Sequence, residues 1–129
     1  MEKQKSVKIA ISATENDLEG DIDARFGRCP YFLIVEIEDK EIKNVEAIEN
    51  TAANQAGGAG ITAAQIVADQ EVVAVITMNA GPRAFDVFNQ LKIKIYTAEG
   101  KAKDAVQDFI DGKLEEISTP TGPQHMGMK

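Results

Sequence analysis

The chain has 129 residues, of which 43% are hydrophobic and 27% charged. This length and composition predict a single domain with its own hydrophobic core, because the chain is too short for two folded domains. The formal net charge of -7 argues against binding to nucleic acid or to an anionic membrane, both of which need a basic surface. We expect a soluble, unprocessed, cytoplasmic protein, because a single cysteine allows no internal disulfide and no apolar run resembles a signal peptide or reaches the roughly 20 residues of a membrane span.

The first half of the chain predicts three strands and one long loop. Apolar and polar residues alternate in Val7–Ala13, which indicates a strand. Thr14–Pro30 is polar, rich in glycine and without periodicity, and a loop of this length in a compact domain is usually functional or disordered. Tyr31–Glu38 and Glu41–Glu49 are the next strands, and the two-residue link Asp39-Lys40 predicts a hairpin between them.

The second half predicts three helices that alternate with two strands. Gly57–Gly60 leads into a helix that ends at Asp69, and the unbroken apolar segment Val72–Thr77 indicates a strand buried on both faces. Gly81 and Pro82 suit the start of the next helix. Its inward stripe is expected to contain Ala84, Phe85, Phe88 and Leu91. The last two elements are a strand at Lys92–Tyr96 and a helix over Ala102–Ile110 that Gly112 closes.

This order predicts an α/β fold with a five-stranded mixed sheet, strand order 3-2-1-4-5, in which strand 2 is antiparallel. We expect residues 7–117 to form the domain, with flexible termini at 1–6 and 118–129. The winding reverses between strands 1 and 4, and ligands of such sheets bind at the carboxyl ends of the strands there. Three loops should meet at this edge: Thr14–Pro30, Gly57–Gly60 and Asn79–Pro82.

Only three of the 14 basic residues are arginines, and Arg25, Arg28 and Arg83 all lie in or directly after these loops. Because a guanidinium group offers a planar fork of donors to an anion, they predict an anion site. The alternative is that Arg25 and Arg28 pair with Asp21 and Asp23 and only hold the loop in place.

Soft metal ligands are few. Cys29 follows Arg28 directly, and neighbouring guanidinium groups would lower its pKa and favour a thiolate ligand. A lone cysteine can equally be a small buried hydrophobe, and a single thiolate leaves a zinc or iron–sulfur site incomplete. His125, Met126 and Met128 would suit copper(I), or they belong to a tail without a metal.

Gly57–Gly60 could cradle an anion with its amides, but Ile61-Thr62 stands where a phosphate-binding loop needs Lys-Ser/Thr. Close packing of the helix on the sheet is the other explanation.

Catalysis has little support, since the one histidine lies in the tail and Val7–Ala13 carries no acidic residue for a two-metal nuclease. We therefore expect a protein that is not an enzyme.

Three segments together resemble the dinitrogenase iron–molybdenum cofactor biosynthesis family. They are Ala24–Leu33 with its Phe-Gly-Arg, the glycine-entered helix start Gly57–Gln65, and Val73–Phe85 with its Gly-Pro-Arg-Ala-Phe. The likeness covers about residues 7 to 112. It implies a ribonuclease H-like, three-layer fold without nuclease activity, and nitrogenase-associated members hold iron–molybdenum cofactor or its precursors.

One departure from the family is that Arg25 stands where cofactor-carrying members often have a histidine. Arginine can hydrogen-bond an anionic cluster but cannot replace imidazole as a ligand. The resemblance then leaves Cys29 as the candidate metal ligand. The residues expected to bind the cofactor are Arg25, Phe26, Gly27, Arg28, Gly58, Gly60, Asn79, Gly81 and Arg83.

Two hypotheses follow. The first is a non-catalytic carrier of an anionic iron–sulfur, molybdenum–sulfur or iron–molybdenum cluster, with cluster donor or acceptor proteins as partners. The second is a metal-free module that binds a phosphate-bearing small molecule or a protein partner. A metal-dependent phosphatase or nuclease that uses Asp21 or Asp23 is a third, weaker candidate.

Overall fold

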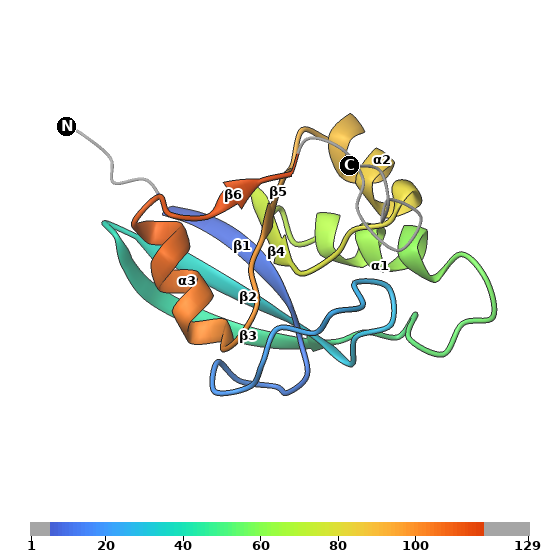
Figure 1. Cartoon of the computed structure of the whole chain (residues 1–129), viewed down its shortest axis with the longest axis horizontal. Coiled ribbons are helices and arrows are strands. Elements are labelled where there is room, and N and C mark those ends of the chain that lie inside the picture. The colour runs from blue at the N-terminus through green and yellow to red at the C-terminus, as the bar shows by residue number, and fades with distance from the viewer. Residues whose placement is uncertain (1–5, 118–129) are drawn as a thin grey trace.

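The computed structural model describes residues 6–117, in which helices lie on both faces of a six-stranded sheet (Figure 1). The strands are β1 (Ser6–Ala13), β2 (Tyr31–Glu38), β3 (Glu41–Glu49), β4 (Ala74–Thr77), β5 (Lys94–Thr97) and β6 (Glu115–Glu116). The helices are α1 (Ala59–Ala68), α2 (Pro82–Gln90) and α3 (Ala102–Ile110). None of these helices is long and apolar enough to span a membrane.

The strand order is β3-β2-β1-β4-β5-β6, which confirms the predicted order 3-2-1-4-5. β1 pairs antiparallel with β2 and parallel with β4, so the winding reverses where it was expected. The prediction of five strands was wrong, because β6 adds a short antiparallel pair at the edge of β5. Two consecutive glutamates carry no hydrophobic period that could have indicated this strand.

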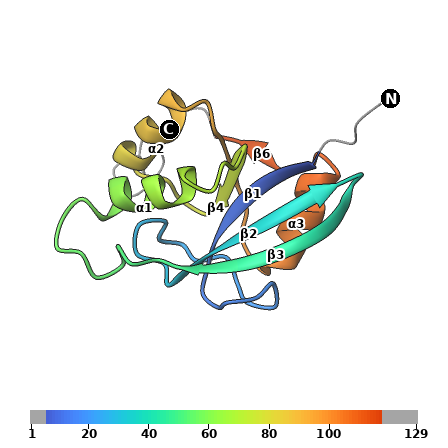
Figure 2. The ribbon, with the colours of Figure 1, turned by 180° about the vertical axis from the view of Figure 1, so that it is seen from behind.

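Two separate cores follow from the alternation of side chains along the strands. α1 and α2 cover one face of the sheet, where Phe32 and Phe88 are fully buried. α3 covers the other face, where it packs against Ile9, Ile11 and Leu33. Figure 2 shows α3 on the opposite side of the sheet from α1 and α2, and this gives the predicted three layers.

Some element boundaries differ from the predictions. α1 begins at Ala59, inside the glycine segment, while β4 and β5 begin two residues later than expected. Leu91 was expected in the inward stripe of α2, but it is 53% exposed because the helix has ended before it. The hairpin is confirmed, and Asp39 and Lys40 have the positive φ angles, 55° and 64°, that its two-residue turn requires.

Candidate anion-binding site

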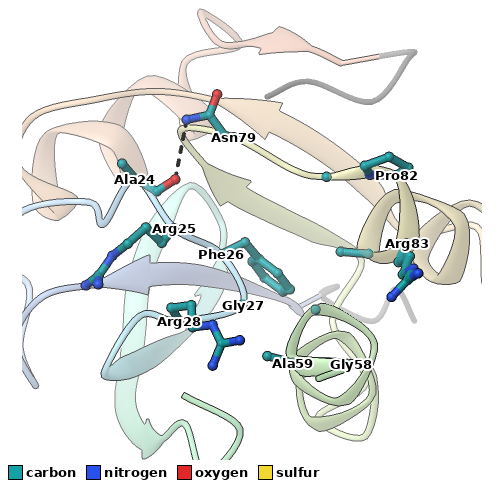
Figure 3. A pocket seen from close by; sticks show the side chains of 13 residues that line it. Ala24, Arg25, Phe26, Gly27, Arg28, Gly58, Ala59, Asn79, Pro82 and Arg83 are labelled. Carbon is teal, nitrogen blue, oxygen red and sulfur yellow. Dashed lines mark hydrogen bonds between the residues drawn. The ribbon is translucent and has the colours of Figure 1, made fainter. Parts of the chain in front are cut away.

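Three segments meet at the carboxyl ends of β1 and β4 and enclose a pocket of about 640 Å³ (Figure 3). All nine residues that were expected to bind a cofactor line it. The pocket is also lined by four residues that were not predicted to bind a cofactor, namely Ala24, Ala59, Pro82 and Ala84. We call this site the arginine pocket, because the guanidinium-bearing side chains Arg25, Arg28 and Arg83 belong to its wall.

The charge of the arginine pocket is opposite to that of the chain. Within the described part of the chain, none of its lining residues is acidic, although the protein as a whole has a formal charge of -7. Arg25 and Arg28 come from the loop before β2, and Arg83 comes from the first turn of α2 (Figure 3). The pocket is therefore a local positive site on an acidic protein, where an anion is attracted.

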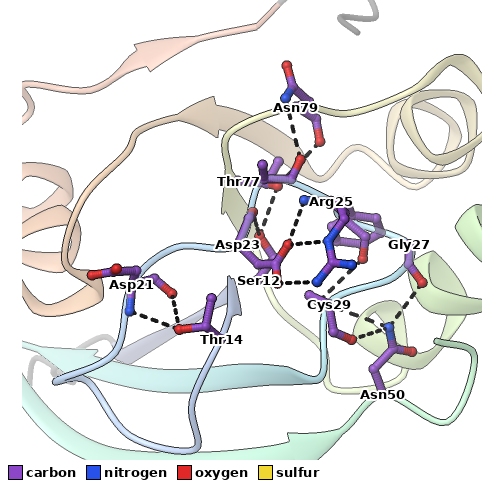
Figure 4. Close-up of polar contacts among 12 residues, drawn as sticks. Ser12, Thr14, Asp21, Asp23, Arg25, Gly27, Cys29, Asn50, Thr77 and Asn79 are labelled. Atoms are coloured by element: carbon purple, nitrogen blue, oxygen red, sulfur yellow. Dashed lines mark hydrogen bonds and ion pairs between the residues drawn. The ribbon is translucent and has the colours of Figure 1, made fainter. Parts of the chain in front are cut away.

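Arg25 is held by Asp23. Its Nε and Nη2 donate to the two carboxylate oxygens at 3.0 and 2.9 Å, and its backbone N–H donates to the first of these at 2.8 Å (Figure 4). Burial by itself would raise the pKa of Asp23. The hydrogen bonds and the charge of Arg25 outweigh the effect of burial, and the pKa of Asp23 therefore lies below its usual value. The Arg25 side chain remains 64% exposed, so it is oriented by this pair and still accessible.

Arg28 has different partners from those expected. Its Nη1 donates to the carbonyl oxygens of Ala53 and Gln55 at 2.9 and 2.6 Å, so the guanidinium group fixes the loop that precedes α1. Asp21 instead bonds through its backbone to the side chain of Thr14 (Figure 4). The alternative of arginine–aspartate pairing thus holds for Arg25 and Asp23, and it is wrong for Arg28.

Arg83 differs from the other two arginines. Within residues 6–117, its guanidinium group takes part in no hydrogen bond or ion pair. It is exposed at the pocket wall, in the first turn of α2. A ligand could therefore bind Arg83 without displacing a described protein partner.

Two helices begin at the arginine pocket, and no described side chain caps either of them. The N-cap residues are Gly58 for α1 and Gly81 for α2, and neither first turn contains an acidic residue. By contrast, α3 carries Asp104 in its first turn, and loop carbonyl groups accept its first amides. Uncapped amides and the helix dipole favour a negatively charged ligand at such ends.

The pocket glycines have different roles. A Cβ on Gly27 would lie 3.1 Å from the Cα and N of Gly60, so the loop before β2 packs closely against this part of the glycine segment. The helix that follows also packs on the sheet, since Ala59 and Ala63 belong to the same core as Phe32. Gly81 has φ -70°, and a Cβ there would meet no protein atom within 4 Å. Neither backbone geometry nor protein packing requires a glycine at position 81, and this residue lines the pocket.

Cys29 lies outside the arginine pocket and has no solvent exposure. Its thiol donates to the carbonyl oxygen of Phe26 at 3.3 Å. Burial, and then the charge of Asp23, raises the pKa of Cys29 to about 12. The predicted lowering of the thiol pKa by neighbouring guanidinium groups was wrong, because burial of the thiol and the charge of Asp23 both disfavour the thiolate. Ligation by Cys29 would require this residue to leave the core.

Asn50, at the end of β3, was missed by the sequence analysis. It is buried, and its Nδ2 donates to the carbonyl oxygens of Gly27 and Cys29 at 3.1 and 2.8 Å (Figure 4). Its Oδ1 accepts from the N–H of Ala52 at 3.0 Å, an Asx-type turn that an asparagine directly after a strand could have suggested. Asn50 thus fixes the turn that carries Arg28.

Metal ligands are scarce in the described part of the chain. Residues 6–117 contain no group of three or more His, Cys, Asp or Glu side chains that could hold a metal ion. The predicted copper(I) ligands His125, Met126 and Met128 lie outside the described residues. The described site therefore offers charge and hydrogen bonds to a ligand, and not a set of metal ligands.

The chain belongs to the dinitrogenase iron-molybdenum cofactor family, which matches residues 7–112. It is 46% identical over 116 residues to Uncharacterized protein MJ0580 of Methanocaldococcus jannaschii, covering 89% of this chain and 95% of that one. Its structure is similar to the apo form of the orange protein from Desulfovibrio gigas, with a TM-score of 0.81, 30% identity, and 89% and 96% of the two chains covered. A Thermotoga protein solved by NMR gives a TM-score of 0.74 at 32% identity, over 90% and 97% of the chains.

Proposed function

We propose that this domain is a non-catalytic carrier that holds a preformed, sulfur-rich metal-cluster anion in the arginine pocket without a bond between metal and protein. The family match associates the chain with iron–molybdenum cofactor. The observation that carries the proposal is the pocket itself, which joins three arginines and two uncapped helix N-termini and includes no described carboxylate. A cargo held in this way must arrive assembled, because Cys29 is sealed in the core.

The apolar part of the pocket favours a sulfide-rich anion over a phosphate. Phe26, Ala59, Pro82 and Ala84 line it beside the arginines. Phosphate oxygens are strongly hydrated and lose free energy against apolar surface unless each is hydrogen-bonded. Sulfide is more polarisable and less hydrated, so it can contact Phe26 and Pro82 while its charge is neutralised by the guanidinium groups.

Retention of a thiometallate tests the proposal. The protein is incubated with tetrathiomolybdate, or with iron and sulfide, separated from the excess by gel filtration and measured by absorption spectroscopy. We expect wild type and Cys29→Ala to retain the anion equally, with an affinity that falls as salt is added. Loss of binding in Cys29→Ala, or no retention by any variant, would contradict the proposal.

Arg83→Gln gives the sharper comparison, because this guanidinium group has no described partner to lose. We expect about 5- to 30-fold weaker thiomolybdate binding, as for the loss of one charge-assisted contact. Lys113→Gln makes the same change in net charge at a residue that does not line the pocket, and this variant should bind as wild type does. Equal effects of the two substitutions would mean that only the overall charge matters.

Two helix N-termini beside arginines can also bind phosphate, which keeps the metal-free module as a second candidate. Inorganic phosphate and nucleotides are therefore added as competitors. Displacement of thiomolybdate only at a large excess of phosphate supports the carrier. Displacement at equal concentrations would favour the phosphate-binding module.

A further inference from the structure

Two buried hydroxyl groups lie at the carboxyl ends of the two parallel strands beside the arginine pocket. Ser12 is the last residue but one of β1, Thr77 is the last residue of β4, and both have no solvent exposure. Their hydroxyl oxygens are 2.9 Å apart (Figure 4). Neither residue lines the pocket. We call these two groups the hydroxyl pair.

The hydroxyl pair contacts both loops that leave these strands. Ser12 Oγ lies 3.1 Å from the carbonyl oxygen of Asp23, and Thr77 Oγ1 lies 3.3 Å from that of Asn79. Each hydroxyl has one proton and also accepts, so the two bond to each other and the pair donates to one of these carbonyl groups at a time. The side chain of Asn79 joins the loops a second time, because its Nδ2 donates to the carbonyl oxygen of Ala24 at 3.4 Å.

These contacts connect the supports of Arg25 and Arg83. The carboxylate of Asp23 holds the guanidinium group of Arg25. Asn79 belongs to the short segment that leads into α2, where Arg83 lies in the first turn. An anion that bonds to both arginines needs them at a fixed separation, to within about 0.5 Å. The relative position of the two loops therefore decides whether one ligand reaches both groups.

The stability of the core does not explain the two hydroxyl groups. Ala10 and Val75, two residues earlier on the same face of these strands, are buried and apolar. A buried hydroxyl costs free energy unless it is hydrogen-bonded, and a bonded pair can be replaced by apolar groups of the same shape at little cost. The buried polar side chains within residues 6–117 are Ser12, Asp23, Asn50 and Thr77. Each of them hydrogen-bonds to a loop that carries pocket residues.

We propose that Ser12 and Thr77 are positioning residues for the arginine pocket. The hydroxyl pair fixes the loop of Arg25 against the start of α2, so that one anion binds Arg25 and Arg83 together. The two residues act through these loops and do not touch the anion. The positioning stands on the contacts above, and its effect on affinity rests on the proposed carrier function.

The double variant Ser12→Ala/Thr77→Val tests the positioning without any anion, and valine keeps the branched shape of threonine. We expect NMR relaxation dispersion to show new motion on the microsecond-to-millisecond timescale at the amides of Ala24, Arg25 and Gly81. The amides of α3, on the opposite face of the sheet (Figure 2), should be unchanged. No new motion in the two loops, or motion of the same size in α3, would overturn the proposal.

Binding of tetrathiomolybdate tests the consequence for affinity. We expect the double variant to bind about 5- to 30-fold more weakly than wild type, as for the loss of one charge-assisted contact. Adding Arg83→Gln should then weaken binding by only about twofold, because interacting groups are not additive. The full effect of Arg83→Gln in both backgrounds would overturn the proposed coupling. If wild type retains no thiomolybdate, the carrier function fails, and the NMR comparison still decides the positioning.

Two controls separate positioning from a general loss of stability. Val106→Ala removes fully buried apolar surface from the core under α3, so it lowers the free energy of unfolding and should bind as wild type does. Thr14→Val removes a hydroxyl that bonds to the same loop at Asp21, which does not line the pocket, and it should also bind normally. A loss in either control as large as that in the double variant would overturn the proposal.

Discussion

Two glycine-to-alanine substitutions separate the binding role of the arginine pocket from its structural role. At position 81, φ is -70° and the added methyl group meets no protein atom within 4 Å. Alanine is a poorer N-cap than glycine but restricts the unfolded chain more, and these effects offset to within about 1 kcal/mol. At position 27, the methyl group would lie 3.1 Å from the backbone of Gly60, and such overpacking costs about 1–3 kcal/mol.

We therefore expect opposite outcomes for Gly81→Ala and Gly27→Ala. Gly81→Ala should unfold in urea like wild type and bind tetrathiomolybdate about 5- to 150-fold more weakly, because a methyl group in the space of the ligand costs about 1–3 kcal/mol. Gly27→Ala should lower the free energy of unfolding itself. If Gly81→Ala binds the anion as tightly as wild type, the cargo does not lie between the two helix N-termini and the reasoning fails.

Three further predictions concern single residues. Cys29 should not react with a thiol reagent at pH 8 until the protein unfolds. Because its folded pKa of about 12 exceeds the unfolded value of roughly 8.5, stability should fall as the pH rises above 8.5, and Cys29→Ala should lack this loss. The pKa of Asp23 is lowered, so its contribution is complete above about pH 4 and disappears in acid; urea titrations should show a weaker acid dependence for Asp23→Asn. Lys40→Gly should raise the free energy of unfolding by about 0.5–1 kcal/mol, because φ at Lys40 is 64°; an unchanged urea midpoint would contradict this.

The elements with a clear hydrophobic period could be predicted from the sequence. The period-two pattern of β1, the apolar segment that becomes β4, and the Gly-Pro start of α2 each have a local physical cause. Chain connectivity and the right-handed crossover rule then gave the strand order. β6 could not be predicted in this way, because its two glutamates have no hydrophobic pattern. They pair with β5 only because the folded chain passes beside the edge of that strand.

The candidate site also has features that could be predicted from the sequence and features that could not. The sequence by itself determined that arginines and glycine-led helix starts would meet at one edge of the sheet, because parallel strands end on the same side. Only the tertiary structure decided the partners of those residues: Arg25 is paired, Arg28 bonds to loop carbonyl groups, and Cys29 faces the core. Side-chain direction and burial depend on contacts between distant segments, and the order of residues along the chain does not contain them.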